Sequence, residues 1–455
     1  MTIVLPDDAR SHFDKEADSL IAALKPLPAR ESPRPHRGSD AHVPSTQFTA
    51  ESLRGRPRIT SVDWQGELKS IEVHGEVLGH QVHEGLPIDD GERLLRVAHA
   101  VARNREVRAK CGPDFVQNHL IDWITRRRLR EGADGSWTTE FLTALESGVE
   151  EQVILVPLDE MAIEAPFELG PVHFDFFTEA SIESMVPPEA IKEAPAESVE
   201  RFRTELKRNY QGHVYARYVC IAEQEHASDL AVENTDKVLE ILRMFDAAAL
   251  EIRARCQFGR IGQLILFERH VFRVGPPERL WLSQGVERKG IVRFGVGQSL
   301  LAMIRDSGFG LAAELLKKDQ HTDLEKHVLE SISHYAHGVA SPAPQDRLVH
   351  ALVAVESLLL RNENEPIQAK LGQRMAMLTA PDLASRKAAV KRLQAGYRLR
   401  SAFVHHGVKP DDVREANEVL LLCWDTLQTV ALNTQKFQSR QALLDSVDDA
   451  LLTGP

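Results

Sequence analysis

The sequence predicts an α+β protein, in which a mixed α/β N-terminal domain is followed by an all-α helical bundle. Apolar and polar residues alternate at 70–77, as they do in a half-buried strand. The segment 152–156 is a short apolar run, which is also typical of a strand. Apolar residues with helical spacing fill 229–247, and strand-like and helix-like segments follow one another in irregular order up to about residue 300. No strand-like segment follows residue 310, so the C-terminal part is expected to be helical.

Three regions are expected along the 455 residues, in line with about 150 residues per domain. Residues 1–60 predict a flexible arm rich in proline and arginine, with a short helix over 9–24. We expect residues 61–309 to form a mixed α+β domain with a sensor or regulatory role. We expect residues 310–455 to form the helical domain.

The predicted elements follow from hydrophobic periodicity. We expect strands at 70–77, 152–156, 172–177, 215–222 and 264–267. We expect helices at 115–129, 140–147, 229–247, 324–338, 347–360, 367–378, 386–404, 412–437 and 441–451. In the segment 412–437, apolar residues recur in alternating steps of three and four, and one continuous apolar stripe of this length indicates packing within a bundle.

Composition narrows the classes of partner. The net charge of −12 argues against broad, sequence-independent binding of nucleic acid, while it permits RNA binding in a local basic cleft. No apolar run reaches the length of a membrane span, and the first residues do not resemble a signal peptide. The cysteines Cys111, Cys220, Cys256 and Cys423 lie far apart in the sequence, so we expect a cytoplasmic protein with reduced thiols and no membrane partner.

The segment 397–407, YRLRSAFVHHG, holds the strongest candidate for a functional site. Arg400 falls on the apolar stripe of its predicted helix, where a guanidinium needs a partner or a wet cleft. His405 comes five positions later, so a regular helix places it about 140° away around the axis. The two groups converge only if the helix loosens there or if two protomers face each other. Gly407 and Pro410 predict a helix break just after His405.

The chemistry of an arginine and a histidine suits RNA cleavage by the ribose 2′-hydroxyl, which needs no metal. Histidine transfers protons near neutral pH, and arginine stabilises negative charge that develops on the phosphate. The same spacing is also typical of a surface or interface arginine in a salt bridge, with a histidine favoured by the dipole at a helix C-terminus. From the residues alone, both interpretations stay open.

The segment resembles the HEPN superfamily, specifically the ApeA-like HEPN domains of bacterial anti-phage proteins. The matching string is Y-x-x-R-S-x-x-V-H-x-G, formed by Tyr397, Arg400, Ser401, Val404, His405 and Gly407. Upstream, 354–359 (AVESLL) resembles the acidic helix of the family, and 370–374 (KLGQR) resembles the next helix. The resemblance covers roughly residues 320–455.

The resemblance implies a homodimeric, metal-independent endoribonuclease without a cofactor, acting in abortive infection against phage. Arg400 would hold the scissile phosphate and His405 would transfer protons, with Glu356 orienting one of them from the neighbouring helix. Tyr397, Ser401 and His406 would support the site. Many toxin members carry Asn, Asp or His where this chain has Ser401, which adds weight to a binding role, and His406 also satisfies the looser spacing of the motif.

The partners that the resemblance implies are RNA, with tRNA as one candidate, a second copy of the chain and a phage-derived trigger protein. The alternative is a non-catalytic HEPN module that binds RNA or protein within a defence assembly. The antiviral role and the sensing role of the N-terminal domain follow from the family and the domain order alone.

Two other clusters contain residue types that bind metals or RNA. His74, His80, His83 and Glu84 include zinc-ligand residue types, but no second pair follows at a ligand spacing, so the alternation predicts a strand or hairpin surface. The basic run 126–130 (RRRLR) ends a helix that contains Trp123. Such a run can contact RNA phosphates, although it is more typical of a solvated helix terminus.

Overall fold

The structure is a computed structural model of the 455-residue chain. It describes residues 3–26, 71–77, 80–129, 135–185, 196–263, 273–274, 280–281, 293–362, 364–406 and 413–453. The chain divides into two compact units, Met1–Gln152 with Val219–Asp229, and Val153–Tyr218 with Leu230–Pro455. None of the helices within the described ranges combines the length and apolar character needed to span a bilayer.

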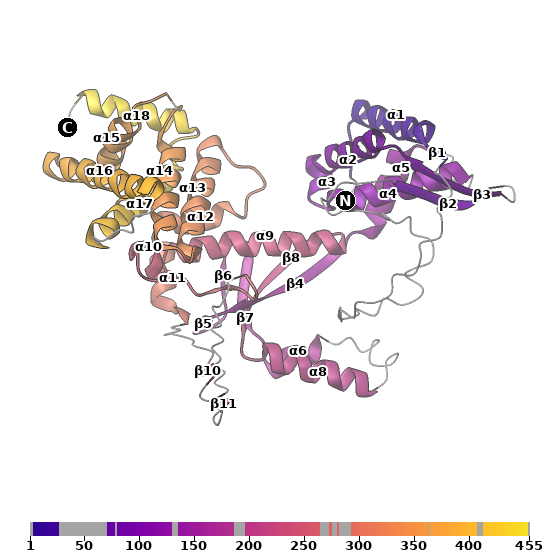
Figure 1. Cartoon of the computed structure of the whole chain (residues 1–455), viewed down its shortest axis with the longest axis horizontal. Helices are drawn as coiled ribbons and strands as arrows, with labels where there is room; N and C mark the ends of the chain where they lie inside the picture. Colours follow the sequence, from indigo (N-terminus) through magenta and orange to yellow (C-terminus); the bar gives the residue numbers. More distant parts are fainter. Residues whose placement is uncertain are drawn as a thin grey trace. The chain divides into compact units, whose positions relative to one another are not determined.

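The first unit is a helical cluster with a small antiparallel sheet (Figure 1). Its elements are α1 Asp7–Ala23, β1 Lys25–Pro26, β2 Ile71–Val77, β3 His80–Leu86, α2 Ile88–Ala102, α3 Arg105–Arg108, α4 Pro113–Leu129 and α5 Trp137–Gly148. Their core includes Leu20 and the stacked pair Trp137 and Phe141, whose ring centroids lie 5.6 Å apart. Because Ala17 and Leu20 are buried in this core, the predicted flexible arm is wrong for residues 3–26. Residues 27–60 of that arm lie outside the described residues.

The main sheet has five strands in the order β6-β7-β8-β4-β9. Its strands are β4 Glu150–Asp159, β6 Phe167–Leu169, β7 Val172–Phe176, β8 Val214–Ala222 and β9 Gly259–Arg260. β6 and β7 form a hairpin that turns at Gly170, where φ is +57° and glycine is favoured. Predicted strands at 152–156, 172–177 and 215–222 are confirmed as β4, β7 and β8, whereas 264–267 lies outside the described residues.

Further helices and short strands lie before the C-terminal helices in the chain. They are β5 Met161–Ile163, α6 Glu179–Ser184, α8 Ala196–Tyr210, α9 Gln224–Arg243, α10 Ala247–Leu250, β10 Arg273–Val274, β11 Leu280–Trp281, β12 Phe294–Val296, α11 Gln298–Arg305 and α12 Gly308–Leu315. β12 pairs with β5 in parallel, whereas the pairs β6–β7, β7–β8 and β4–β9 are antiparallel. The α+β class is therefore confirmed.

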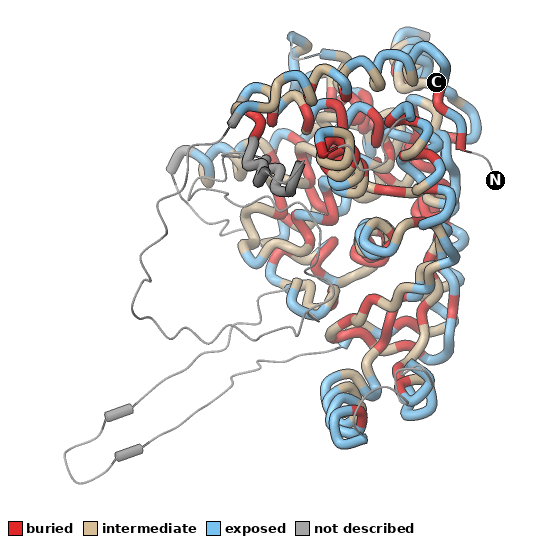
Figure 2. Tube along the Cα trace, turned by 90° about the vertical axis from the view of Figure 1, so that its right-hand side faces the viewer, coloured by how far each residue is buried: buried red, intermediate tan, exposed pale blue. Residues whose placement is uncertain are grey.

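The C-terminal helices are α13 Asp323–Ala340, α14 Pro344–Leu359, α15 Ile367–Thr379, α16 Leu383–His406, α17 Val413–Asn433 and α18 Arg440–Thr453. Each was predicted within a few residues, and the described residues after 310 contain no strand. Buried residues of these helices, of α9 and of the main sheet form one hydrophobic cluster. Figure 2 shows the buried positions on the inner sides of the helices. The predicted boundary at 309/310 lies inside the second unit, and the division near residue 152 was not predicted.

Candidate functional site

Helix α16 presents the candidate motif on a long, regular backbone. At its N-terminus the Asp382 carboxylate accepts hydrogen bonds from the Ser385 amide at 2.9 Å and the Ser385 hydroxyl at 2.7 Å. These bonds, the amide bond first, lower the pKa of Asp382 and satisfy a backbone donor of the first turn. Ala389 and Leu393 are buried, and the same stripe continues to Tyr397 and Arg400.

Gly396 allows α16 to approach α17 closely. A Cβ atom at this position would lie 2.8 Å from Cγ1 of Val419, which is nearer than side chains pack. Glycine is unfavourable within a helix, so the close approach gives a packing reason for it here. The contact fixes α16 against α17 one residue before Tyr397.

Arg400 and Tyr397 meet the same carboxylate oxygen. Arg400 Nη1 donates to Oε1 of Glu356 at 2.8 Å, and the Tyr397 hydroxyl donates to that atom at 2.6 Å. Glu356 comes from α14, so the cluster joins two helices that are far apart in the sequence. The side chains of Arg400 and Glu356 are 31% and 19% exposed, so the ion pair lies at the edge of the core.

Electrostatics keeps the Tyr397 hydroxyl a donor. Burial and the hydrogen bond to the Glu356 carboxylate raise the pKa of Tyr397 well above its ordinary value. The buried Cys423 thiol nearby is also neutral, because burial, and next the charge of Glu356, raise its pKa. The cluster therefore holds one carboxylate, one guanidinium and one neutral phenol, without a thiolate nucleophile.

Arg400 keeps most of its hydrogen-bonding capacity. A guanidinium has five N–H donors, and among the described residues only Glu356 accepts from that of Arg400. The remaining donors and the exposed third of the side chain are available to an anion. This arrangement suits an arginine that holds a phosphate more than one that closes a buried salt bridge.

The histidines of the motif lie in the last turn of α16, which remains helical through His406. The backbone does not loosen at His405, because no glycine or proline interrupts residues 397–406. The break that was predicted just after His405, from Gly407 and Pro410, falls on positions outside the described residues and stays a prediction. Helical geometry places position 405 about 140° around the axis from position 400 and on the face of position 401. The side chains of both histidines lie outside the described part of the chain.

Ser401 lines an open groove with a volume of about 610 Å³. The lining residues come from α15 and α16 and are Gln368, Gln394, Tyr397, Arg398, Ser401 and Ala402. Tyr397 and Ser401 were predicted from the sequence as site residues, whereas Gln368, Gln394 and Arg398 were not. Their signal was available in part, because 394, 398 and 401 share one polar face of the predicted helix.

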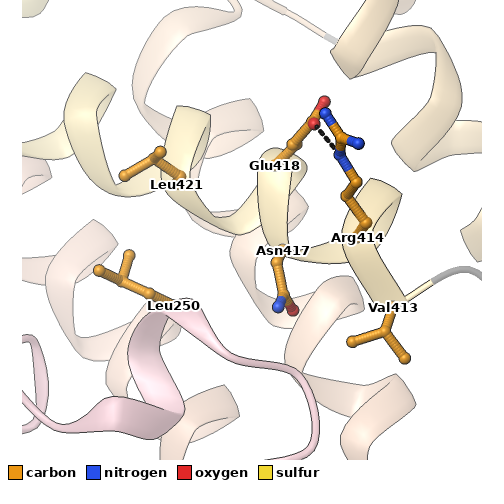
Figure 3. Close-up of a pocket in the computed structure, with 6 residues that line it drawn as sticks. All are labelled: Leu250, Val413, Arg414, Asn417, Glu418 and Leu421. Atoms are coloured by element: carbon orange, nitrogen blue, oxygen red, sulfur yellow. Dashed lines mark hydrogen bonds and ion pairs between the residues drawn. The ribbon is translucent and has the colours of Figure 1, made fainter.

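A second hollow, of about 470 Å³, is lined by Leu250 and by residues of α17 (Figure 3). Its polar groups are already engaged. Arg414 pairs with Glu418 at 3.1 Å, and the Asn417 amide oxygen accepts from the backbone amide of Ile252 at 2.8 Å. No residue of the candidate motif lines this hollow.

The structure adds little support for a site at the basic run 126–130 or at the histidine cluster of 74–84. Arg126 pairs with Asp122 at 2.8 Å and with Glu140 at 3.0 Å, while Arg127 lies 5.6 Å from the ring centroid of Trp123. The start of the basic run is thus engaged within the first unit, and Arg130 lies outside the described residues. Strands β2 and β3 form the predicted hairpin, with His74 opposite His83, although the side chains of 71–84 lie beyond what the structure describes.

The chain was compared with protein-family models, with curated proteins and with solved structures, and none of them matches.

Proposed function

We propose that residues 310–455 form a HEPN-type, metal-independent endoribonuclease module, which acts in anti-phage abortive infection. The supporting observation is the partly exposed side chain of Arg400, whose guanidinium Glu356 holds by one hydrogen bond from the neighbouring helix. A cation that is fixed in place and still open to an anion is what stabilisation of a phosphorane-like transition state requires. The motif string and the helical character of residues 323–453 are consistent with this proposal.

In the proposed reaction, the 2′-oxygen of the substrate attacks the adjacent phosphorus, and the bond from phosphorus to the 5′-oxygen breaks. A histidine removes the 2′-hydroxyl proton, and the leaving 5′-oxygen takes a proton from solvent water. The products are a 2′,3′-cyclic phosphate and a 5′-hydroxyl end. Arg400 binds the non-bridging phosphate oxygens, and Glu356 with Tyr397 keeps the guanidinium in position.

The proposed site is shared between two copies of the chain. Positions 400 and 405 diverge by about 140° on an unbroken helix, so one chain directs them to different sides. A second α16 facing the first brings Arg400 of one protomer beside position 405 of its partner. A homodimer is therefore part of the proposal, as are a phage-derived trigger and a sensing role for the N-terminal region.

The test is cleavage of total cellular RNA, tRNA included, by the purified full-length protein in EDTA. We expect cleavage that leaves cyclic phosphate ends, and a loss of about 100-fold or more in rate for Arg400→Ala. His405→Ala and His406→Ala, made separately, identify the histidine that matters. The matched control is Arg392→Ala on the same helix, which removes an ion pair with Glu418.

Equal rates for Arg400→Ala and Arg392→Ala would refute the assignment of the site. A non-catalytic HEPN module, our second candidate, predicts RNA binding without cleavage in every variant. The partly exposed Arg400 side chain and the Ser401 hydroxyl, which has no partner among the described residues, are compatible with such binding. In cells, growth arrest on infection that Arg400→Ala relieves would support the nuclease.

A further inference from the structure

We propose that the groove between α15 and α16 holds one unpaired nucleobase of the RNA, and that Gln368 and Gln394 determine which base is accepted. This inference rests on the proposed function, since it concerns the substrate preference of the same site. Nothing in the motif itself specifies a base, because arginine and histidine act on the phosphate and the ribose. The preference has to come from side chains beside the motif.

Two amides from different helices line the groove. Gln368 lies in the first turn of α15 and Gln394 near the middle of α16, and both are exposed. Neither side chain has a hydrogen-bond partner among the described residues. Each amide offers a carbonyl acceptor and an NH₂ donor, which is the combination that reads the edge of a base. Hydrogen bonds from these amides to a base would not require breaking a hydrogen bond to another described residue.

Tyr397 supplies an aromatic surface in the same groove. Its hydroxyl donates to Glu356, so the ring is what the side chain can offer to a ligand. Unpaired bases in RNA commonly stack on aromatic rings, and this stacking tolerates any base. The tyrosine can therefore seat a base while the glutamines discriminate between bases.

Among the described residues, the lining of the groove holds no negatively charged side chain. Arg398 is its one charged lining residue, 69% exposed, and pairs with Glu415 through Nη2 at 2.7 Å. The Ser401 hydroxyl has no partner in the described part of the chain. In a protein with a net charge of −12, a lining that has no carboxylate within the described part of the chain permits a local approach of phosphate.

Size and position agree with this occupant. A volume of about 610 Å³ falls within the range of roughly 300–1,000 Å³ typical of small-ligand sites. The groove is open to solvent, so a base can enter it from outside. Tyr397 belongs both to the groove and to the Arg400 cluster, so the seated nucleotide lies next to the phosphate that Arg400 would hold.

The experiment uses full-length protein and a pool of short RNAs with randomised bases, with cut positions determined by sequencing. We expect the wild type to prefer one base beside the cut. The double variant Gln368→Ala/Gln394→Ala should reduce this preference by about tenfold. The control is Gln373→Ala, an exposed glutamine on α15 that does not line the groove and has no partner in the described residues.

A parallel measurement separates this inference from the proposed function. Binding is measured with a 2′-O-methyl version of the pool, which lacks the attacking hydroxyl. Cleavage without base preference, or with a preference that the double variant keeps, overturns the role of the groove and leaves the nuclease intact. Selective binding that depends on the two glutamines, without cleavage of RNA by the wild type, supports the groove and overturns the nuclease. Neither selective binding nor cleavage overturns both.

Discussion

Arg374 and Arg400 lie in the same helical region, and both meet carboxylates from other parts of the chain, yet they differ in how fully they are bonded. Arg374 is completely buried and donates to Glu365, Asp448 and the carbonyl oxygen of Leu359 at 2.6–3.0 Å. These five bonds use all its N–H donors. Within the described part of the chain, Arg400 uses one donor, and its side chain remains 31% exposed.

The difference separates an arginine whose donors are all used within the fold from one that keeps open donors among the described residues. The Arg374 cluster ties α18 to α15 and to the segment after α14, and leaves nothing free for a ligand. Although burial lowers the pKa of Arg374, the bonds to Asp448 and Glu365 outweigh it and raise the pKa. Arg400 has a fixed position and open donors, which is the condition for binding an anion.

The largest expected effect is on stability at the saturated cluster. Arg374→Met should lower the free energy of unfolding by about 3–5 kcal/mol, because Glu365 and Asp448 would lose their buried partner. Urea unfolding followed by circular dichroism measures it. Arg414→Met is the control, since its side chain is 89% exposed and should change stability by at most about 0.5 kcal/mol. Similar losses in the two variants would contradict the structural role of Arg374.

The pH dependence of the same cluster should be intermediate in size. The hydrogen bonds from Arg374, and next that from Arg361, lower the pKa of Asp448 to about 2, from an ordinary value of 3.8. A carboxylate with a depressed pKa stabilises the fold above its unfolded pKa, and this contribution is lost as the pH falls through the folded value. Wild type should therefore exceed Asp448→Asn in stability at pH 6, and the gap should close between about pH 4 and pH 2.

When both proteins also carry Arg374→Met, the stability difference between the chain with Asp448 and its Asp448→Asn variant should disappear nearer pH 4. The main cause of the lowered pKa of Asp448 is then absent. Thermal midpoints measured across the pH range test both statements. A gap that stays constant from pH 6 to pH 2 would show that Asp448 does not contribute through its charge.

The smallest expected effect on stability is at the unsaturated cluster. Arg400→Met should cost no more than about 1 kcal/mol, because the ion pair is partly exposed and Glu356 keeps the Tyr397 hydroxyl. The same urea unfolding measures it. A loss as large as that of Arg374→Met would remove the contrast and make Arg400 a structural residue.

Periodicity predicted the elements well, because a helix or strand records its environment in residues that are near in sequence. Helices α13–α18 and strands β4, β7 and β8 were predicted within a few residues. The division near residue 152 was missed, because it depends on which segments pack together and not on any local pattern. A short helix was predicted at 9–24, and the structure has it at residues 7–23. Its burial in a core was not predicted, because the proline-rich segment that follows it is typical of a flexible arm.

The candidate site was predictable in part. Arg400, Tyr397 and Glu356 were named from the sequence, and the structure joins them. The five bonds of Arg374 were not foreseen, because Asp448 lies 74 residues away and no spacing connects the two. The groove was missed for the same reason, since Gln368 and Gln394 become neighbours only when α15 packs on α16.

Because α16 is one unbroken helix through His406, the activity should depend strongly on protein concentration. Under the proposed function, a single chain carries two half-sites that point apart, and only a pair of chains completes a site. The number of complete sites in dilute protein then rises with the square of the chain concentration. Doubling the amount of protein would quadruple the cutting capacity, so a modest rise in abundance could take a cell from tolerance to arrest.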